Sequence, residues 1–366
     1  MSELIRNEYD PDAVTPPGDT LQEMLDTVGM TKAELAERIG KTQKHLVDII
    51  KHGAPITPTT AMELEKALST PASFWNNRES RYRESLARQE ERKRLERETP
   101  ILNRFPVYEM AKAGWISKHK NKVDQVHELL RFFGVASFDQ WESLWFSYNP
   151  AYRQSKAFKS SPEAGSAWLR QGELQAQFIE CQHYNRDRFR AALSDIRQLT
   201  RTEPEQFESK TVQLCAVAGV AVVFTPPIKG APIYGATRWL TVNKALIQLS
   251  SRGKFEDLLW FTFFHEAGHI LLHGKKEVFI EDDNQQTDKE KEADKFAANF
   301  LIFPKKWREF VRSSNYRSAE GVKEFAEKIG IAPAIVVGRL QHQKMIPYTH
   351  LNGLRRRFDI GITSNL

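Results

Sequence analysis

Residues 260–274 of the 366-residue chain read WFTFFHEAGHILLHG, and this segment predicts a buried helix with a metal site in the second half of the chain. His265 and His269 are four positions apart, so on a helix both imidazoles lie on one face and can reach one metal ion. The apolar residues on both sides predict that the helix is buried. Burying two imidazoles and the Glu266 carboxyl without partners is costly, and a bound Zn²⁺ removes that cost. The alternative is a pair of hydrogen-bonded core histidines.

Glu266 stands beside the two histidines, where it can take a proton from water at the metal, whose pKa zinc lowers toward about 7. His273 continues the four-residue spacing, but it lies about 12 Å from His265 along a helix axis at roughly 1.5 Å per residue. We therefore expect His273 to contact a ligand side chain, the helix end or the substrate, and not to share the ion.

A third protein ligand is expected from the next helical segment, residues 288–303. Glu290, Glu292 and Asp294 are all candidates, because each carries a carboxylate that a zinc ion accepts. The apolar stripe of this segment is broad, so helical periodicity does not choose among the three. Any one of them also fits an ordinary solvated carboxylate.

Around these two helices the pattern changes from helical to mixed. Apolar runs at residues 215–225, 233–241 and 245–250 predict buried strands, and residues 254–273 predict the helix of the histidine motif. A small sheet beside two helices, followed by a helical tail, indicates an α+β domain over residues 211–366.

The N-terminal part predicts a different kind of site. Ala36, Gly40, Leu46 and Ile49 have the spacing of a helix-turn-helix. Ala36 is small where two helices touch, Gly40 tolerates the positive φ of a tight turn, and the two larger residues anchor the second helix. The second helix begins near Thr42.

The outward positions of this second helix are polar or basic. Such side chains reach base edges and phosphates when a helix lies in the major groove of DNA. A helical hairpin with a hydrated polar face is the alternative. The candidate DNA-binding residues are Thr42, Gln43, Lys44, His45, Asp48 and Lys51.

The remaining segments divide the chain into domains. Residues 1–78 form the expected helix-turn-helix domain, and residues 79–100, dense in both charge signs, predict a solvated helical linker. Residues 101–210 are rich in aromatic residues and predict a helical middle domain without a chemical motif. The fold class is therefore mainly helical α+β, with an all-α N-terminal domain.

Bulk composition sets the compartment and the partners. The net charge of +6 permits nucleic-acid binding without requiring it. Cys181 and Cys215 lie in unrelated contexts and do not indicate disulfides. No apolar run approaches the roughly 20 residues that span a bilayer, so we expect a cytoplasmic protein with no membrane partner.

Residues 17–83 resemble the helix-turn-helix of HigA-type antitoxins within the XRE family. The stretches that carry the resemblance are PGDTLQEML, TKAELAERIGKTQKHLVDIIKHGAPITPTTAMELEKAL and TPASFWNNRESRYRE. The resemblance implies binding to double-stranded operator DNA as a homodimer, with each half-site contacted by the helix over residues 42–51. The exposed positions of that helix are specific to this chain, so the operator sequence does not carry over.

Residues 213–304 resemble the ImmA/IrrE family of metallopeptidases, through GATRWL, ALIQLSSR, WFTFFHEAGHILLHG and EADKFAANFLIFP. The resemblance implies a zincin-like fold and makes Glu292, which opens the Glu-Ala-x-x-Phe-Ala segment, the third zinc ligand beside the two histidines. Water then completes an open four-coordinate site. Tyr234, Arg238 and His273 are candidates for stabilising charge on the substrate in the transition state.

Together the two resemblances imply a DNA-binding transcriptional regulator joined to a zinc endopeptidase. Its substrate would be a regulatory protein in a stress or toxin–antitoxin response. One alternative is a non-proteolytic antitoxin or repressor whose metal-binding domain binds a toxin or ligand. Another is a zinc hydrolase of small molecules. Glu266 favours hydrolysis, because a structural zinc site needs no base beside it.

Overall fold

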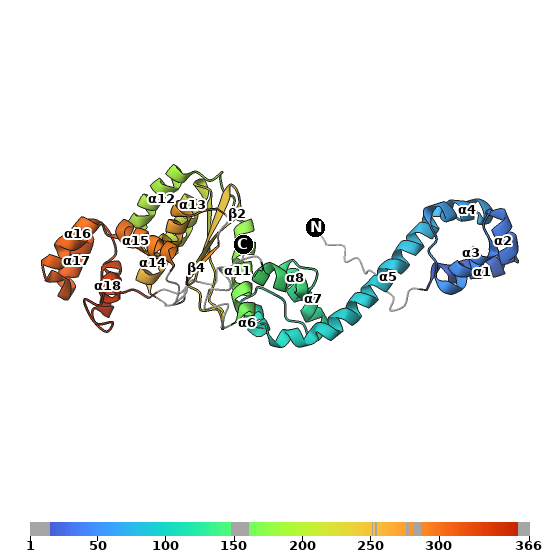
Figure 1. The fold of residues 1–366 in the computed structure, drawn as a ribbon, viewed down its shortest axis with the longest axis horizontal. Coiled ribbons are helices and arrows are strands. Elements are labelled where there is room, and N and C mark those ends of the chain that lie inside the picture. Colours follow the sequence, from blue (N-terminus) through green and yellow to red (C-terminus); the bar gives the residue numbers. More distant parts are fainter. Residues whose placement is uncertain are drawn as a thin grey trace, which may run out of the picture. The chain divides into compact units, whose positions relative to one another are not determined.

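The structure is a computed structural model that describes residues 15–147, 161–250, 252, 255–275, 278–281 and 287–357. It forms two compact units, Met1–Thr99 and Pro100–Leu366, which we describe separately (Figure 1).

The first unit is a bundle of short helices followed by one long helix. The helices are α1 (Pro17–Val28), α2 (Lys32–Arg38), α3 (Gln43–His52), α4 (Pro58–Leu68) and α5 (Ala72–Glu98). A capping box begins α2: Thr31 Oγ1 accepts from the Glu34 backbone N–H at 3.2 Å, and the Glu34 carboxylate accepts from the Thr31 N–H at 3.1 Å. Gly40 adopts φ +66° in the turn between α2 and α3. The predicted helix-turn-helix is confirmed.

The first turns of helix α5 pack against the helix-turn-helix, although its charge density predicts a solvated linker. Trp75, on its first turn, is fully buried in the core of the first unit. Glu79 accepts a hydrogen bond from the Ile56 backbone N–H at 3.1 Å, and Arg83 donates to the Gly53 carbonyl at 2.7 Å. The contacts of the helix-turn-helix therefore extend beyond residue 78, onto the first turns of α5.

The second unit contains a four-stranded sheet surrounded by helices. Its strands are β1 (Val220–Phe224), β2 (Gly235–Thr241), β3 (Lys244–Leu249) and β4 (Phe279–Glu281). Its α-helices are α6 (Val107–Lys112), α7 (Lys122–Phe133), α8 (Phe138–Glu142), α11 (Pro162–Gln177), α12 (Arg186–Leu199), α13 (Pro204–Val217), α14 (Glu256–Leu272), α15 (Asp288–Leu301), α16 (Pro304–Arg312), α17 (Ala319–Ile329) and α18 (Pro333–His342).

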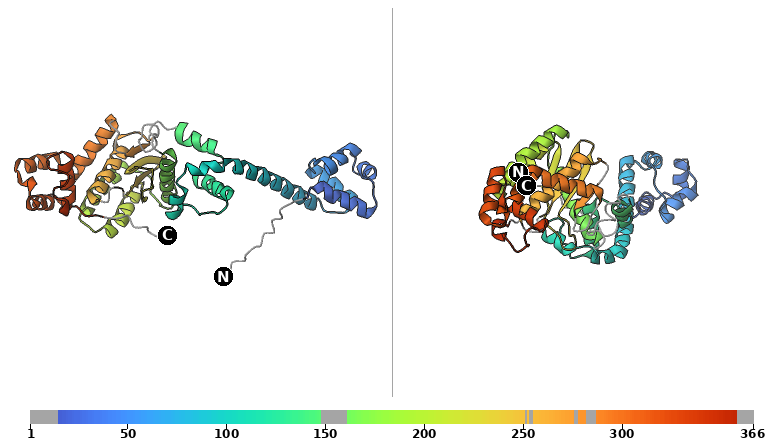
Figure 2. Two further views of the ribbon diagram at one scale, coloured as in Figure 1. Left: turned by 90° about the horizontal axis from the view of Figure 1, so that it is seen from below. Right: turned by 60° about the vertical axis from the view of Figure 1, so that its left-hand side comes forward.

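The sheet is mixed, and helices cover both of its faces. The strand order is β1-β3-β2-β4, with β1 parallel to β3 and the other pairs antiparallel. Side chains alternate along β1: Ala221 and Val223 face α11, whereas Val220 and Val222 face the main core with α12, α13 and α14. At the far side of α14, α18 packs against it and α17 packs against α18 (Figure 2).

The first predicted strand is wrong at its start. Residues 215–217 end helix α13, and β1 begins only at Val220. An apolar run of this length fits a buried helix end as well as a strand, so periodicity alone misplaced the boundary. Gly219, at φ +86°, makes the turn between them, and a Cβ there would come within 2.2 Å of the Tyr184 Cα.

Helix α11, expected in a separate middle domain, packs directly on the sheet. The Trp168 indole on α11 donates to the Thr225 carbonyl at 3.3 Å, and the Gln248 side chain on β3 donates to the Trp168 carbonyl at 2.6 Å. The structure therefore places residues 161–217 in one compact unit with the sheet. None of the helices in the described residues is long and apolar enough to cross a membrane.

Candidate metal centre and nucleic-acid interface

Helices α14 and α15 pack closely, and this packing brings the histidine motif and the acidic helix together. Gly268 on α14 allows the approach, because a Cβ there would lie 3.1 Å from the Phe296 ring and 3.3 Å from the Ala293 Cα on α15. The Thr287 hydroxyl caps α15 by accepting from the Glu290 N–H at 3.3 Å. The first turn of α15 is thereby held beside the histidines.

Three ligand atoms converge at this crossing. His265 Nε2 lies 2.9 Å from Glu290 Oε2 and 2.9 Å from His269 Nε2, and His269 Nε2 lies 3.4 Å from Glu290 Oε2. Tetrahedral ligands about 2.0–2.1 Å from a zinc ion are about 3.3 Å from one another. All three residues are at most 5% exposed. Among the described residues, His265, His269 and Glu290 are the group whose ligand atoms lie close enough together to hold one metal ion.

The third carboxylate differs from the one that the resemblance implied. Glu290 meets the histidines, whereas the Glu292 side chain is 64% exposed and contacts His273 Nε2 at 3.1 Å. Glu290 shares the buried face of α15 with Ala293 and Ala297, at helical spacing of three and four residues. Glu292, two residues further along α15, points to another side of the helix. The prediction that Glu292 is the third ligand is therefore replaced by Glu290, and Glu292 is a contact of His273.

A carboxylate holds the outer nitrogen of His265, and a third imidazole holds that of His269. Asp294 Oδ1 lies 2.8 Å from His265 Nδ1 and accepts its proton. Glu292 accepts from His273 Nε2, so His273 Nδ1 is left to accept from His269 Nδ1 at 2.9 Å. This assignment of protons leaves the Nε2 lone pairs of His265 and His269 directed at the common site, as metal ligation requires.

The electrostatics of the cluster favour a cation. Burial raises the pKa of Glu290, but the adjacent imidazoles of His265 and His269 outweigh burial and lower it to about 2. Burial lowers the pKa of His269 to about 4, which keeps this imidazole neutral near pH 7. Burial also lowers the pKa of His265, but Glu281, Asp294 and Glu290 outweigh it and raise the pKa well above its usual value. The surrounding negative charge therefore stabilises positive charge at this point.

Glu266 lies fully buried next to the three ligands. Neither of its carboxylate oxygens has a hydrogen-bond partner in the described part of the chain. Burial raises its pKa well above the usual value, against the opposing effect of His265. Gly235 on β2 makes room for it, since a Cβ there would lie 2.7 Å from Glu266 Oε1 and 2.5 Å from the Thr262 methyl. An unpaired buried carboxylate is expensive unless a ligand or water completes it.

Other residues named from the sequence lie as follows. Arg238 forms an ion pair with Glu173 of α11. Tyr234 precedes β2, donates from its backbone N–H to the Glu281 carbonyl at 3.1 Å, and has its ring 4.8 Å from the Arg252 guanidinium. Sequence reasoning missed Glu281 altogether, because it lies on a three-residue strand within a polar stretch.

The candidate DNA-contacting residues lie on α3 and at its N-cap. The Thr42 hydroxyl caps the helix by accepting from the His45 N–H at 3.2 Å. Gln43, Lys44 and Lys51 are exposed. His45 and Asp48 are only half-buried, and His45 Nε2 is covered without a hydrogen-bond partner among the described residues. The exposed amide and ammonium groups suit contacts with bases and phosphates.

Two families match this chain. Residues 21–75 match the helix-turn-helix family, and residues 215–341 match a peptidase family described as the IrrE N-terminal-like domain. Both resemblances drawn from the sequence are thereby confirmed. The second match contains α14, α15 and all three ligand residues.

Two solved structures are similar to part of the chain. One is a putative antidote protein of a plasmid maintenance system from Nostoc punctiforme, with 25% identity over 23% of this chain and 91% of its own, at a TM-score of 0.22. The other is an addiction module antidote protein of the HigA family from Coxiella burnetii, with 27% identity over 23% of this chain and 94% of its own, at a TM-score of 0.22. No curated protein matches the chain.

Proposed function

Starting from a chain that joins a helix-turn-helix domain to an IrrE N-terminal-like domain, we propose a DNA-binding transcriptional regulator with a zinc-dependent endopeptidase domain. Its substrate is a regulatory protein. The observation that carries the proposal is the buried Glu266 carboxylate, unpaired in the described part of the chain, beside two histidines and a carboxylate that converge on one point.

The donor set fits zinc. Two imidazole nitrogens and one carboxylate oxygen are the ligands of open, catalytic zinc sites, which keep a fourth position for water or substrate. His265, His269 and Glu290 would hold the ion, with Asp294 and His273 holding the outer imidazole nitrogens. A bound zinc ion supplies Lewis-acid chemistry: it polarises a carbonyl oxygen and makes water acidic enough to ionise near neutral pH.

Glu266 performs the proton transfers of peptide hydrolysis. Its carboxylate takes a proton from the attacking water and delivers it to the amide nitrogen as the C–N bond breaks. The absence of hydrogen-bond partners within the described chain leaves both oxygens available for this task. The apolar surroundings that raise its pKa also bring it closer to the neutral range in which a general base and acid works best.

The rival function is that of a repressor or antitoxin whose metal domain binds a toxin or ligand without cutting it. Glu266→Gln separates the two functions, because it preserves side-chain size and removes the base. We expect this variant to keep zinc and DNA binding and to lose cleavage by a factor of at least about 10³.

The experiment compares zinc-loaded wild-type protein and Glu266→Gln in an extract of the source cells. Newly formed protein N-termini are labelled and identified by mass spectrometry. Termini that appear with the wild type and are missing with the variant support the peptidase. The same termini from both proteins, or none from either, would refute proteolysis and leave the rival function. His269→Ala, which removes a ligand, serves as the matched control.

The N-terminal domain supplies the second partner, double-stranded operator DNA. We propose that α3 enters the major groove and that the protein binds as a homodimer with one half-site per chain. Exposed Lys44 and Lys51, on the helix that follows the turn, support this placement. In this proposal the DNA-bound chain carries its peptidase to regulatory proteins that act at the same operator.

A further inference from the structure

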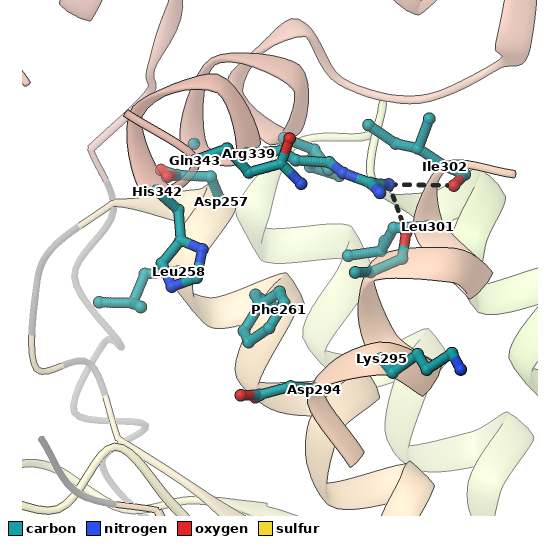
Figure 3. A pocket seen from close by; sticks show the side chains of 13 residues that line it. Asp257, Leu258, Phe261, Asp294, Lys295, Leu301, Ile302, Arg339, His342 and Gln343 are labelled. Atoms are coloured by element: carbon teal, nitrogen blue, oxygen red, sulfur yellow. Dashed lines mark hydrogen bonds between the residues drawn. The ribbon is translucent and has the colours of Figure 1, made fainter. Parts of the chain in front are cut away.

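A pocket of about 310 Å³ lies between α14, α15 and α18 (Figure 3), and its wall includes Asp294, the partner of His265. Its volume is at the lower end of those of small-molecule sites, which suits a ligand of roughly ten non-hydrogen atoms. Most of its wall is apolar. The apolar lining residues are Leu258, Phe261, Ala298, Leu301, Ile302 and Ile335.

The two carboxylates in the wall already have partners. Asp257 binds the Arg355 guanidinium through both oxygens, at 3.0 and 2.9 Å. Asp294 accepts from His265 Nδ1 at 2.8 Å. By contrast, Lys295 and Arg339, which also line the pocket, have no carboxylate partner in the described part of the chain. The pocket therefore contains two cationic groups that form no ion pair with a carboxylate in those residues.

Arg339 is the more buried of these two cations. Its Nη1 group donates to the carbonyls of Ala298 and Ile302, at 2.8 and 3.1 Å, and its guanidinium lies 4.5 Å from the centre of the Trp307 ring. These contacts orient the group, and Figure 3 shows it extended along the pocket wall. Its Nη2 group makes no hydrogen bond within the described residues.

The guanidinium therefore has donors that no described residue uses: Nη2, and Nε, which is buried without a partner. Burial lowers the pKa of Arg339 to about 10, which still leaves it charged at neutral pH. A half-buried cation without a counter-ion attracts an anion more strongly than an exposed one, because the local dielectric constant is lower.

We propose that this pocket binds a small amphipathic anion, with an apolar chain or ring against Phe261 and Ile335 and its negative group at Arg339. The site shares Asp294 with the surroundings of the metal centre but contains none of the three candidate metal ligands, and its proposed ligand is a molecule other than the peptidase substrate. The inference does not depend on proteolysis, because every group that carries it lies outside the three metal ligands.

Calorimetric titration of the full-length, zinc-loaded protein tests the proposal with three probes that share one chain length. Octane-1-sulfonate carries a negative group that is a poor metal ligand, octan-1-ol is neutral, and octyltrimethylammonium is positive. We expect saturable 1:1 binding of the sulfonate, at least about tenfold tighter than that of the alcohol, and the weakest binding for the ammonium.

Substitutions at Arg339 and Ala298, with one control at Arg308, locate the binding. Arg339→Gln should remove the preference for the sulfonate and Arg339→Lys should retain it, while Arg308→Gln, at an exposed arginine of α16 outside the pocket, should change nothing. Because Arg339 also orients the end of α15, Ala298→Leu provides an independent test. The added atoms fill the pocket and should abolish binding with unchanged zinc content and circular dichroism.

Three outcomes would overturn the proposal. They are the absence of saturable sulfonate binding, equal binding of all three probes, and sulfonate binding that survives Ala298→Leu. The last would place the anion elsewhere, for instance at the metal. None of them bears on the cleavage test with Glu266→Gln, so the two proposals fail separately.

Discussion

Glu290 and Glu292 are two positions apart on α15, and a rotation of about 200° about the helix axis separates their side chains. Glu290 is buried against both ligand imidazoles, whereas Glu292 reaches only the outer nitrogen of His273. Chemically the two residues are the same. Their roles differ only because one face of α15 is turned toward α14.

This difference predicts the metal affinities of two matched variants. Glu290→Gln should weaken zinc binding by at least about 10²-fold, because a ligand is lost. Glu292→Gln should weaken it by no more than about tenfold, because only the orientation of His273 changes. Competition with a chromophoric chelator measures both affinities. The reverse order would restore Glu292 as the ligand.

Gly235 tests how Glu266 is accommodated. In Gly235→Ala the new methyl group would meet the Glu266 carboxylate and the Thr262 methyl at less than 3 Å, so one of them must shift. We expect a loss of about 1–3 kcal/mol in unfolding free energy, measured by urea denaturation, and loss of cleavage with zinc retained. Gly353→Ala, where a Cβ meets nothing within 4 Å, is the control. Full activity of Gly235→Ala would show that Glu266 is not confined as described.

Helix α3 combines buried apolar and exposed basic side chains on one short element. Leu46 and Ile49 are buried in the core of the first unit, and Lys44 and Lys51 are exposed on other faces. The capping bond of Thr42 and the left-handed Gly53 define the helix ends. The exposed side is thereby held rigidly by the buried one.

The salt dependence of DNA binding tests this helix. Lys44→Ala or Lys51→Ala should weaken binding to an operator selected from random duplexes, and each should lower the slope of log K against log salt by about one. Lys66→Ala, at an exposed lysine of α4, should leave the slope unchanged. Slopes equal to that of the wild type for both α3 variants would remove α3 from the interface.

Arg355 and Arg356, far along the chain from α14, hold the N-terminus of this helix in place. The Arg356 carbonyl accepts from the Glu256 N–H at 3.1 Å, and the Arg356 side chain binds the Glu256 carboxylate. Arg355 forms a two-pronged, largely buried pair with Asp257. Residues about 100 positions apart thus stabilise the N-terminus of α14.

Removing Arg355 should destabilise the second unit by about 3 kcal/mol at pH 7, because a buried Asp257 carboxylate is left uncompensated. Burial already raises the pKa of Asp257, against the effect of Arg355, and losing the guanidinium raises it further. The folded state of Arg355→Ala then binds a proton at Asp257 more tightly than the unfolded state does. The free energy of unfolding therefore falls as pH rises from the unfolded-state pKa of Asp257 to its folded-state pKa. The deficit of Arg355→Ala should therefore shrink between pH 7 and pH 5.

Urea unfolding of the wild type and Arg355→Ala at both pH values measures this change. In an Asp257→Asn background the effect of Arg355→Ala should be smaller and should no longer depend on pH, because the titrating group is gone. A deficit that stays constant on acidification in the Asp257 protein would contradict the assignment.

Much of this architecture follows from local patterns. The helix-turn-helix, the sheet with its two adjoining helices, and the pairing of His265 with His269 were predictable, because caps, turns and side-chain periodicity act over a few residues. The boundary between α13 and β1 was not, since Cys215 belongs to an apolar run that fits either element. The candidate DNA-binding and catalytic residues stay predictions until they are tested.

Local residue patterns specify which elements form and which chemistry they carry: two imidazoles and the Glu266 carboxyl on one helix, and three candidate carboxylates, Glu290, Glu292 and Asp294, on the next. The packing of the helices selects Glu290 as the carboxylate that meets the imidazoles, brings Asp294 and His273 to their outer nitrogens, and places α11–α13 in one unit with the sheet. The physical reason is that the rotation of one helix against another depends on distant contacts. In this protein the distant contacts are the close approach of Gly268 to Ala293 and the binding of Arg355 and Arg356 to the first turn of α14. Residue spacing within one helix does not encode such contacts.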